Sequence, residues 1–207
     1  MLEWILLIGE AKAAGAEIEY VPVVSSPPSG FPRTLIDVAS RLPLDTDARE
    51  PDLVTYAHEA SHFLCRGREG FHGIYVTNGL RIYIPTPPLL TEDVFQAIPA
   101  GERGPIWNTY RDQGRSEYWA AQPLMLLDEW TAYLHGSMAR GELGLTTRRE
   151  SDVYCAEMAR YVHQLYVMAG KCPGYPIKEL KAFCVWNDDR CRRAIPDWGT
   201  LFTKTFR

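Results

Sequence analysis

Two histidines and a glutamate stand close together in the segment His58-Glu59-Ala60-Ser61-His62, which matches the HExxH pattern. Histidines four positions apart project from the same face of a helix, so both imidazoles can reach one metal ion. The glutamate between them then turns toward a water molecule bound at that metal. The spacing predicts a hydrolytic metal site in outline.

A catalytic zinc site needs a third protein ligand and leaves its fourth position for water. The segment from Leu124 to Gly136 is predicted as an apolar helix, and the acidic pair Asp128-Glu129 interrupts it. Burying a carboxylate is costly unless it meets a cation or a metal. Glu129 is therefore the leading candidate for the third ligand, with Asp128 and His135 as alternatives.

His58-Glu59-Ala60-Ser61-His62 followed by Glu129-Trp130-Thr131-Ala132 resembles the zincin metallopeptidases of the gluzincin type. The resemblance covers the two helices that carry these segments and not the rest of the chain. It implies a zincin-like α+β fold and a peptide or protein substrate. It also implies that His58, His62 and Glu129 bind zinc. Glu59 would be the general base.

The second half of that pattern departs from thermolysin-like members. Those enzymes place an aspartate one turn after the glutamate ligand, where it orients a zinc-bound histidine, whereas this chain has Tyr133. Tyr133 and Asp128 are the candidates for that supporting role. The stretch between His62 and Glu129 is also longer than in those enzymes, so it must contain an insertion.

The chemistry expected of such a site follows from charge. Zinc lowers the pKa of a bound water from about 16 toward about 7, so that Glu59 can accept its proton and later return it to the leaving amine. The oxyanion that forms needs a further hydrogen-bond donor, for which Tyr154 and His163 are candidates. Against that role, Tyr154 falls on an apolar helical stripe and His163 points away from it toward solvent.

The helix that carries the histidine pair has recognisable ends. Pro51 and Asp52 suit its first turn, and Gly67 stands where a C-cap would end a buried helix of roughly four turns. Two strands, 71–76 and 80–84, are expected to follow. Asn78-Gly79 predicts a tight hairpin turn between them, as an active-site wall or as scaffold.

The preceding residues predict a helix over 2–14, a strand over 17–24, a loop over 25–32 and a short helix near 33–41. Residues 1–32 are therefore a candidate peripheral segment.

Between the hairpin and the second helix, residues 85–115 are rich in proline, glycine and charge, which indicates either a lid or binding loop or a surface excursion. Ser116 is expected to cap a helix that Pro123 kinks or restarts. Residues 147–150 read as a capping box for a helix that ends near Gly170. A final helix from about 177 carries basic side chains expected to form a solvated face, namely Lys178, Lys181, Arg190, Arg192 and Arg193.

Composition limits the remaining possibilities. With 207 residues, of which 46% are hydrophobic, the chain can bury a sizeable core as one domain over 1–207, with a mainly helical C-terminal half. A net charge of −4 argues against a nucleic-acid partner, and no apolar run approaches the roughly 20 residues of a membrane span. Without a recognisable signal peptide the default location is the cytoplasm. If the chain is exported by another route, a disulfide could form among Cys172, Cys184 and Cys191.

Two classes of function remain open on these observations. The first is a zinc-dependent peptidase. The second is a zincin-like domain that has lost turnover and acts as a binding, regulatory or effector (toxin) module. Glu59 favours the first, because an inactive relative commonly loses its general base. A closed structural zinc site is disfavoured, since such sites use four Cys or His ligands.

Overall fold

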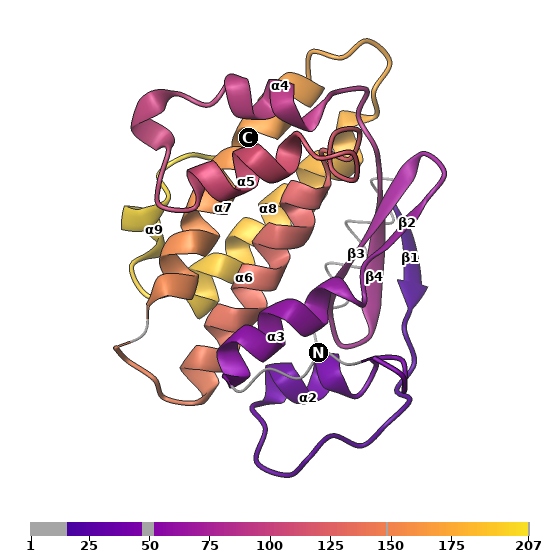
Figure 1. Cartoon of the computed structure of the whole chain (residues 1–207), viewed down its shortest axis with the longest axis vertical. Helices are drawn as coiled ribbons and strands as arrows, with labels where there is room; N and C mark the ends of the chain where they lie inside the picture. The colour runs from indigo at the N-terminus through magenta and orange to yellow at the C-terminus, as the bar shows by residue number, and fades with distance from the viewer. Residues whose placement is uncertain (1–15, 47–51, 148, 207) are drawn as a thin grey trace.

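The computed structural model describes residues 16–46, 52–147 and 149–206 of the chain. It has an α+β fold, in which a small antiparallel sheet lies beside a larger group of helices (Figure 1). This confirms the predicted α+β class, whereas the zincin-like character of the fold stays a prediction. The helix predicted over 2–14 lies outside the described residues.

The sheet contains four strands in the order β1-β4-β3-β2. Their bounds are Glu17–Tyr20 for β1, Arg66–Arg68 for β2, Phe71–Thr77 for β3 and Leu80–Pro85 for β4. The β3–β4 hairpin turns at Asn78 and Gly79, whose φ angles are 52° and 77°. The hairpin prediction is confirmed, because these two residue types tolerate positive φ. Strand β1 is shorter than predicted, and β2 has no counterpart in the sequence analysis.

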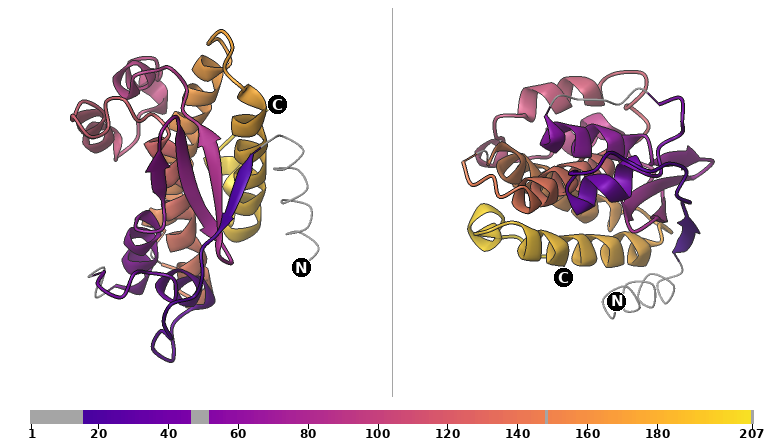
Figure 2. Two further views of the ribbon diagram at one scale, coloured as in Figure 1. Left: turned by 90° about the vertical axis from the view of Figure 1, so that its right-hand side faces the viewer. Right: turned by 90° about the horizontal axis from the view of Figure 1, so that it is seen from below.

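The sheet is packed on both faces. Ile74, Val76, Ile82 and Ile84 belong to the main hydrophobic core that the helices of the C-terminal half complete. On the other face of β3, Tyr75 joins a smaller cluster with Val38 and Ala60. Figure 2 shows the sheet face-on with the long helices behind it. The alternation of β3 side chains thus connects the N-terminal helices to the rest of the molecule.

Helices contain more of the described residues than strands do. Their bounds are Arg33–Ala39 for α2, Leu53–His62 for α3, Met125–Glu142 for α6, Glu150–Ala169 for α7, Ile177–Ala194 for α8 and Trp198–Leu201 for α9. None of the described helices is long and apolar enough to cross a bilayer. All five cysteines are free thiols.

Helix α3 carries the histidine pair and packs along α6. Asp52 caps its N-terminus, because its carboxylate accepts a hydrogen bond from Val54 N at 2.9 Å. The two helices approach closely at Gly136, where an added Cβ would lie 3.3 Å from the Val54 carbonyl oxygen. The predicted end of the helix is wrong: α3 stops at His62, and Gly67 lies in β2 because this part of the chain pairs with β3.

Residues 85–115 are more ordered than their composition suggested. They contain α4 (Thr91–Gln96), a short 3-10 helix (Ala100–Glu102) and α5 (Trp107–Gly114). Phe95 and Tyr110 are buried in the main core, which explains why this segment folds against the molecule. The expectation of an irregular loop or surface excursion is therefore wrong, whereas a role of this segment as a lid or in binding stays a prediction.

Three local predictions in the second half are also corrected. Ser116 does not begin an α-helix, because the chain makes successive turns from there to the start of α6. Helix α7 begins after Arg149 without a side-chain cap among the described residues, although it does end just before Gly170. Arg190 does not lie on a solvated face; it is 9% exposed.

Candidate metal centre

Three potential metal ligands from two helices meet at one point. His58 and His62 project from α3, and Glu129 projects from α6. The Nε2 atoms of the two histidines are 3.2 Å apart. Glu129 Oε2 lies 3.5 Å from His58 Nε2, and Glu129 Oε1 lies 3.6 Å from His62 Nε2. This largely buried cluster could hold a metal ion.

The separations within the cluster fit a tetrahedral ion. Ligand bonds of about 2.0–2.1 Å in a tetrahedron place neighbouring ligand atoms about 3.3–3.4 Å apart. The three measured separations run from 3.2 to 3.6 Å. Two imidazole nitrogens and one carboxylate oxygen also match the donor types that zinc prefers, with a fourth position left over.

Asp128 lies behind His62 and fixes its ring. Its Oδ1 atom is 3.0 Å from His62 Nδ1, the ring nitrogen on the side away from Glu129. The same oxygen accepts a hydrogen bond from the Cys65 thiol at 3.1 Å, and Oδ2 lies 3.6 Å from His72 Nε2. Asp128 therefore occupies the supporting position for which it and Tyr133 were candidates, and not the ligand position.

Charge is concentrated between these groups. Burial alone would lower the pKa of His62, but Asp128 and then Glu129 and Glu59 raise that pKa to about 9. Burial alone would raise the pKa of Asp128, but the charge and hydrogen bond of His62 hold it well below its usual range. The carboxylates thus favour positive charge at this point of the molecule.

Two tyrosines hold the other side of the cluster. The Tyr110 hydroxyl donates a hydrogen bond to Glu129 Oε2 at 2.6 Å and lies 2.9 Å from the Tyr133 hydroxyl. The Tyr133 ring packs against the His58 ring with centroids 4.3 Å apart. Tyr133 thus supports the site through ring packing and through Tyr110. Burial and the Glu129 charge raise the pKa of Tyr110, so it remains a neutral donor.

A cleft of about 500 Å³ opens beside His58. Glu59 and Tyr133 line it on one side, and Tyr154 lines it from α7. The Glu59 side chain is 47% exposed, and its Oε1 atom is 3.8 Å from His58 Nε2. Tyr154 packs edge-on against Tyr133 with ring centroids 5.7 Å apart. A molecule bound in this cleft would meet Glu59 and Tyr154 beside His58.

The remaining two histidines of the sequence analysis lie elsewhere. The His163 ring packs against Phe206, with centroids 5.5 Å apart, and is half-buried instead of facing solvent. The described residues that line the cleft do not include it. His135 is completely buried, with Nδ1 2.7 Å from Ser61 Oγ and Nε2 against the Val76 carbonyl oxygen. Neither is placed to act as the third ligand or as an oxyanion donor.

Tyr110 is the unpredicted residue that contacts a candidate ligand directly. It comes from α5, inside the segment expected to be a loop. A signal was present, because Ile106, Tyr110 and Gly114 recur at intervals of four and all three are buried. Cys65 and His72, which surround Asp128, carry no comparable signal, since β2 and β3 bring them there only through strand pairing.

Comparisons with protein-family models, with curated proteins and with solved structures found no significant match. The functional interpretation therefore depends on the residues of this chain and their geometry.

Proposed function

We propose that this protein is a zinc-dependent hydrolase that cleaves peptide bonds, with Glu59 as its general base. The observation that carries the proposal is the meeting of His58, His62 and Glu129 within 3.2–3.6 Å of one another, with His58 in the wall of an open cleft. A closed structural site would bury all its ligands away from such a cleft. An open site with three protein ligands is typical of catalytic zinc.

Zinc is the proposed metal because of the donor set. Imidazole nitrogen together with a single carboxylate suits zinc, whereas magnesium and calcium prefer sites made of oxygen ligands. When bound, zinc supplies Lewis acidity and lowers the pKa of a coordinated water toward about 7.

The roles of the chain's own residues follow from their positions. Glu59 is exposed to the cleft and close to His58, so it can accept a proton from water and deliver it to a leaving amine. Tyr154 lines the same cleft and offers a hydroxyl donor for the oxyanion. Asp128 and Tyr110 keep His62 and Glu129 in orientation.

The central experiment compares wild type with Glu59→Gln. We expect the purified wild type to hold about one zinc per chain and to cleave members of a peptide library, with zinc measured by elemental analysis and products by mass spectrometry. Glu59→Gln should keep its zinc and lose at least about 100-fold in rate, because an amide of the same shape cannot accept the proton. Glu150→Gln is a matched control, since Glu150 lines the same cleft.

Two outcomes would count against the proposal. Equal cleavage rates for wild type and Glu59→Gln would remove Glu59 from the role of base. A wild type that holds zinc but cuts no peptide in a broad library would favour the binding, regulatory or effector module.

A further inference from the structure

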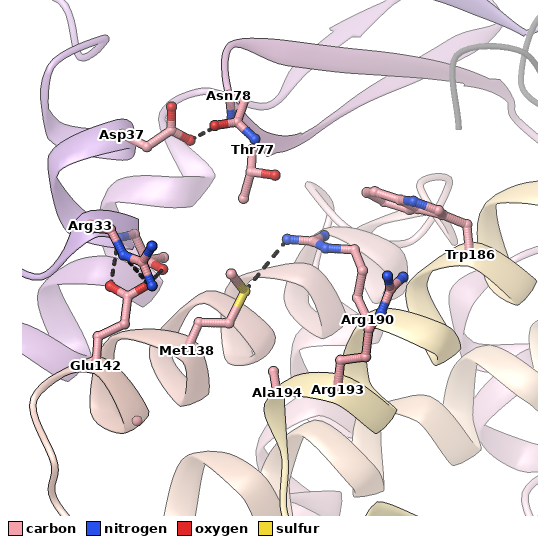
Figure 3. Close-up of a pocket in the computed structure, with 12 residues that line it drawn as sticks. Arg33, Asp37, Thr77, Asn78, Met138, Glu142, Trp186, Arg190, Arg193 and Ala194 are labelled. Carbon is pink, nitrogen blue, oxygen red and sulfur yellow. Dashed lines mark hydrogen bonds and ion pairs between the residues drawn. The ribbon is translucent and has the colours of Figure 1, made fainter. Parts of the chain in front are cut away.

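A second cavity lies away from the metal centre, at the other end of α6. It has a volume of about 720 Å³ and lies between α2, the β3–β4 turn, α6 and α8. Its lining includes Thr77, Met138, Trp186 and Arg190. Figure 3 shows the guanidinium of Arg190 reaching from α8 toward Met138, with Trp186 beside it. None of the residues of the metal centre lines this cavity.

Arg190 is a buried cation whose partners are all neutral. It donates hydrogen bonds to Asn187 Oδ1 at 3.2 Å and to the Val76 carbonyl oxygen at 3.1 Å. Its Nη2 atom also lies 3.7 Å from Met138 Sδ, and its guanidinium lies 4.6 Å from the centre of the Trp186 ring. Within the described part of the chain, no carboxylate forms an ion pair with Arg190. A buried guanidinium without a counter-charge is costly.

A buried histidine beside this cation is also uncharged. His135 Nε2 lies 3.2 Å from Arg190 Nη2. Burial and then Arg190 lower the pKa of His135 to about 3, so the imidazole is neutral at neutral pH. Burial lowers the pKa of Arg190 to about 10, which still leaves the guanidinium charged. Arg190 therefore presents to the cavity a positive charge that no adjacent carboxylate compensates.

The two acids in the cavity wall are already engaged with other groups. Asp37 accepts hydrogen bonds from Arg41 Nε at 3.1 Å, from the Tyr75 hydroxyl at 2.7 Å and from Asn78 N at 2.7 Å. Glu142 accepts from Thr34 N at 2.8 Å and from Thr34 Oγ1 at 3.0 Å. Neither forms an ion pair with Arg190, and Arg33 and Arg193 add positive charge to the same cavity wall.

We propose that this cavity binds a small organic monocarboxylate, with the carboxylate on Arg190 and the apolar body against Trp186 and Met138. A planar carboxylate matches the fork of a guanidinium, and the indole ring and thioether offer an apolar surface to the rest of the ligand. Inorganic phosphate carries no apolar group that could contact Trp186 and Met138. The site is independent of the proposed hydrolase function.

Isothermal titration calorimetry on the full chain tests this proposal with phenylacetate as the probe. A chelator in the buffer removes any binding of the carboxylate to a metal ion. We expect saturable binding of phenylacetate, binding of phenylacetamide that is at least about tenfold weaker because it lacks the charge, and weaker binding still of inorganic phosphate. Saturation by phosphate but not by phenylacetate would overturn the proposal, as would no binding of phenylacetate at all.

A pair of substitutions at Met138 locates the binding. Met138→Glu keeps the length of the side chain and places a carboxylate next to Arg190. It should therefore weaken phenylacetate binding by about 10- to 100-fold. Because the new carboxylate compensates the buried charge, its melting temperature should be higher than that of Met138→Gln. Met138→Gln keeps the shape without the charge; it loses the thioether contact to the ligand, so it should bind more weakly than wild type but more tightly than Met138→Glu. Circular dichroism checks that both variants fold. Equal affinities of the two variants for phenylacetate would overturn the assignment to Arg190.

A third variant separates this cavity from the metal centre. Glu129→Ala should bind phenylacetate as wild type does. Loss of phenylacetate binding in Glu129→Ala would place the carboxylate at the metal centre and overturn the proposal.

Discussion

The helix pair α3–α6 holds histidines in two different environments. At the metal centre, the Nε2 atoms of His58 and His62 face each other across 3.2 Å beside an open cleft. In the second environment, further along α6, both ring nitrogens of His135 lie against protein atoms. One contacts Ser61 Oγ and the other contacts the Val76 carbonyl oxygen. The same side chain is a candidate ligand in one place and part of the core in the other.

The neighbouring charges explain this difference. Asp128, Glu129 and Glu59 raise the pKa of His62 to about 9. Burial and Arg190 lower the pKa of His135 to about 3. Carboxylates create a site that attracts a cation, whereas a buried guanidinium creates one that excludes it. Histidine content by itself therefore says little about metal binding until the charges around each ring are known.

Removing the carboxylate ligand should have the largest effect on the metal centre. We expect Glu129→Ala to weaken zinc binding by at least about 100-fold, more than the loss of an outer partner usually costs. His135→Gln is the contrasting variant and should bind zinc as wild type does. Competition with a chelator of known affinity measures both. Full zinc affinity in Glu129→Ala would transfer the third-ligand role to another residue.

Asp128→Asn should have a smaller effect on the same property. The amide keeps the shape of the carboxylate but removes the negative charge beside His62 Nδ1. We expect zinc binding to weaken by about 10- to 100-fold. Asp112→Asn is the matched control, because Asp112 is an exposed aspartate paired with Arg111. If both variants bind zinc equally well, Asp128 does not support His62.

Tyr110→Phe tests the hydrogen bond on the other side of the centre. It removes the hydroxyl that donates to Glu129 Oε2 and leaves the aromatic ring in the core. We expect a loss of zinc affinity of up to about tenfold, the lower end of the effect of an outer partner. Tyr118→Phe provides the comparison, since Tyr118 is 66% exposed. A loss equal to that of Glu129→Ala would mean that Tyr110 does more than orient the carboxylate.

The buried position of His135 should affect how the stability of the protein depends on pH, and not how the protein binds metal. The pKa of His135 is lowered to about 3 in the folded protein. Below about pH 6.5 the unfolded chain therefore binds a proton at this histidine that the folded protein does not bind. This contribution to stability is present above pH 6.5 and is lost at about 1.4 kcal/mol per pH unit as the pH falls toward 3.

His135→Gln should lack that part of the slope, so the stability gap between wild type and variant should narrow with acid. Urea unfolding in the presence of a chelator, from pH 7 to pH 4, measures the gap. A constant gap over this range would contradict a neutral, buried His135.

Several local features were predictable because they depend on neighbours in the sequence. Helical periodicity places His58 and His62 on one face of α3, and the turn at Asn78 and Gly79 joins β3 to β4 as expected. The second helix was also identified, although α6 continues to Glu142. The α5 helix was missed, since its proline- and glycine-rich flanks outweighed a short pattern of buried positions.

The choice between Asp128 and Glu129 as the third ligand depends on tertiary structure. Adjacent residues on a helix project about 100° apart, so the sequence narrows the third ligand to a pair but cannot say which member points to the metal. The rotation of α6 against α3 decides this, and the two helices approach closely at Gly136. It brings Glu129 toward His62 Nε2 and Asp128 toward His62 Nδ1.

Arg190 shows the same limit for a charged residue. Its position in a basic helix predicted a solvated side chain, and five of the charged residues of that helix were grouped accordingly. The packing of α8 against β3 and α6 buries it among neutral partners instead. Residue type and periodicity thus determined which side chains were available for chemistry. Only contacts between elements distant in the sequence decided which of them face a metal, a cavity or the core, because burial and local charge are set by those contacts.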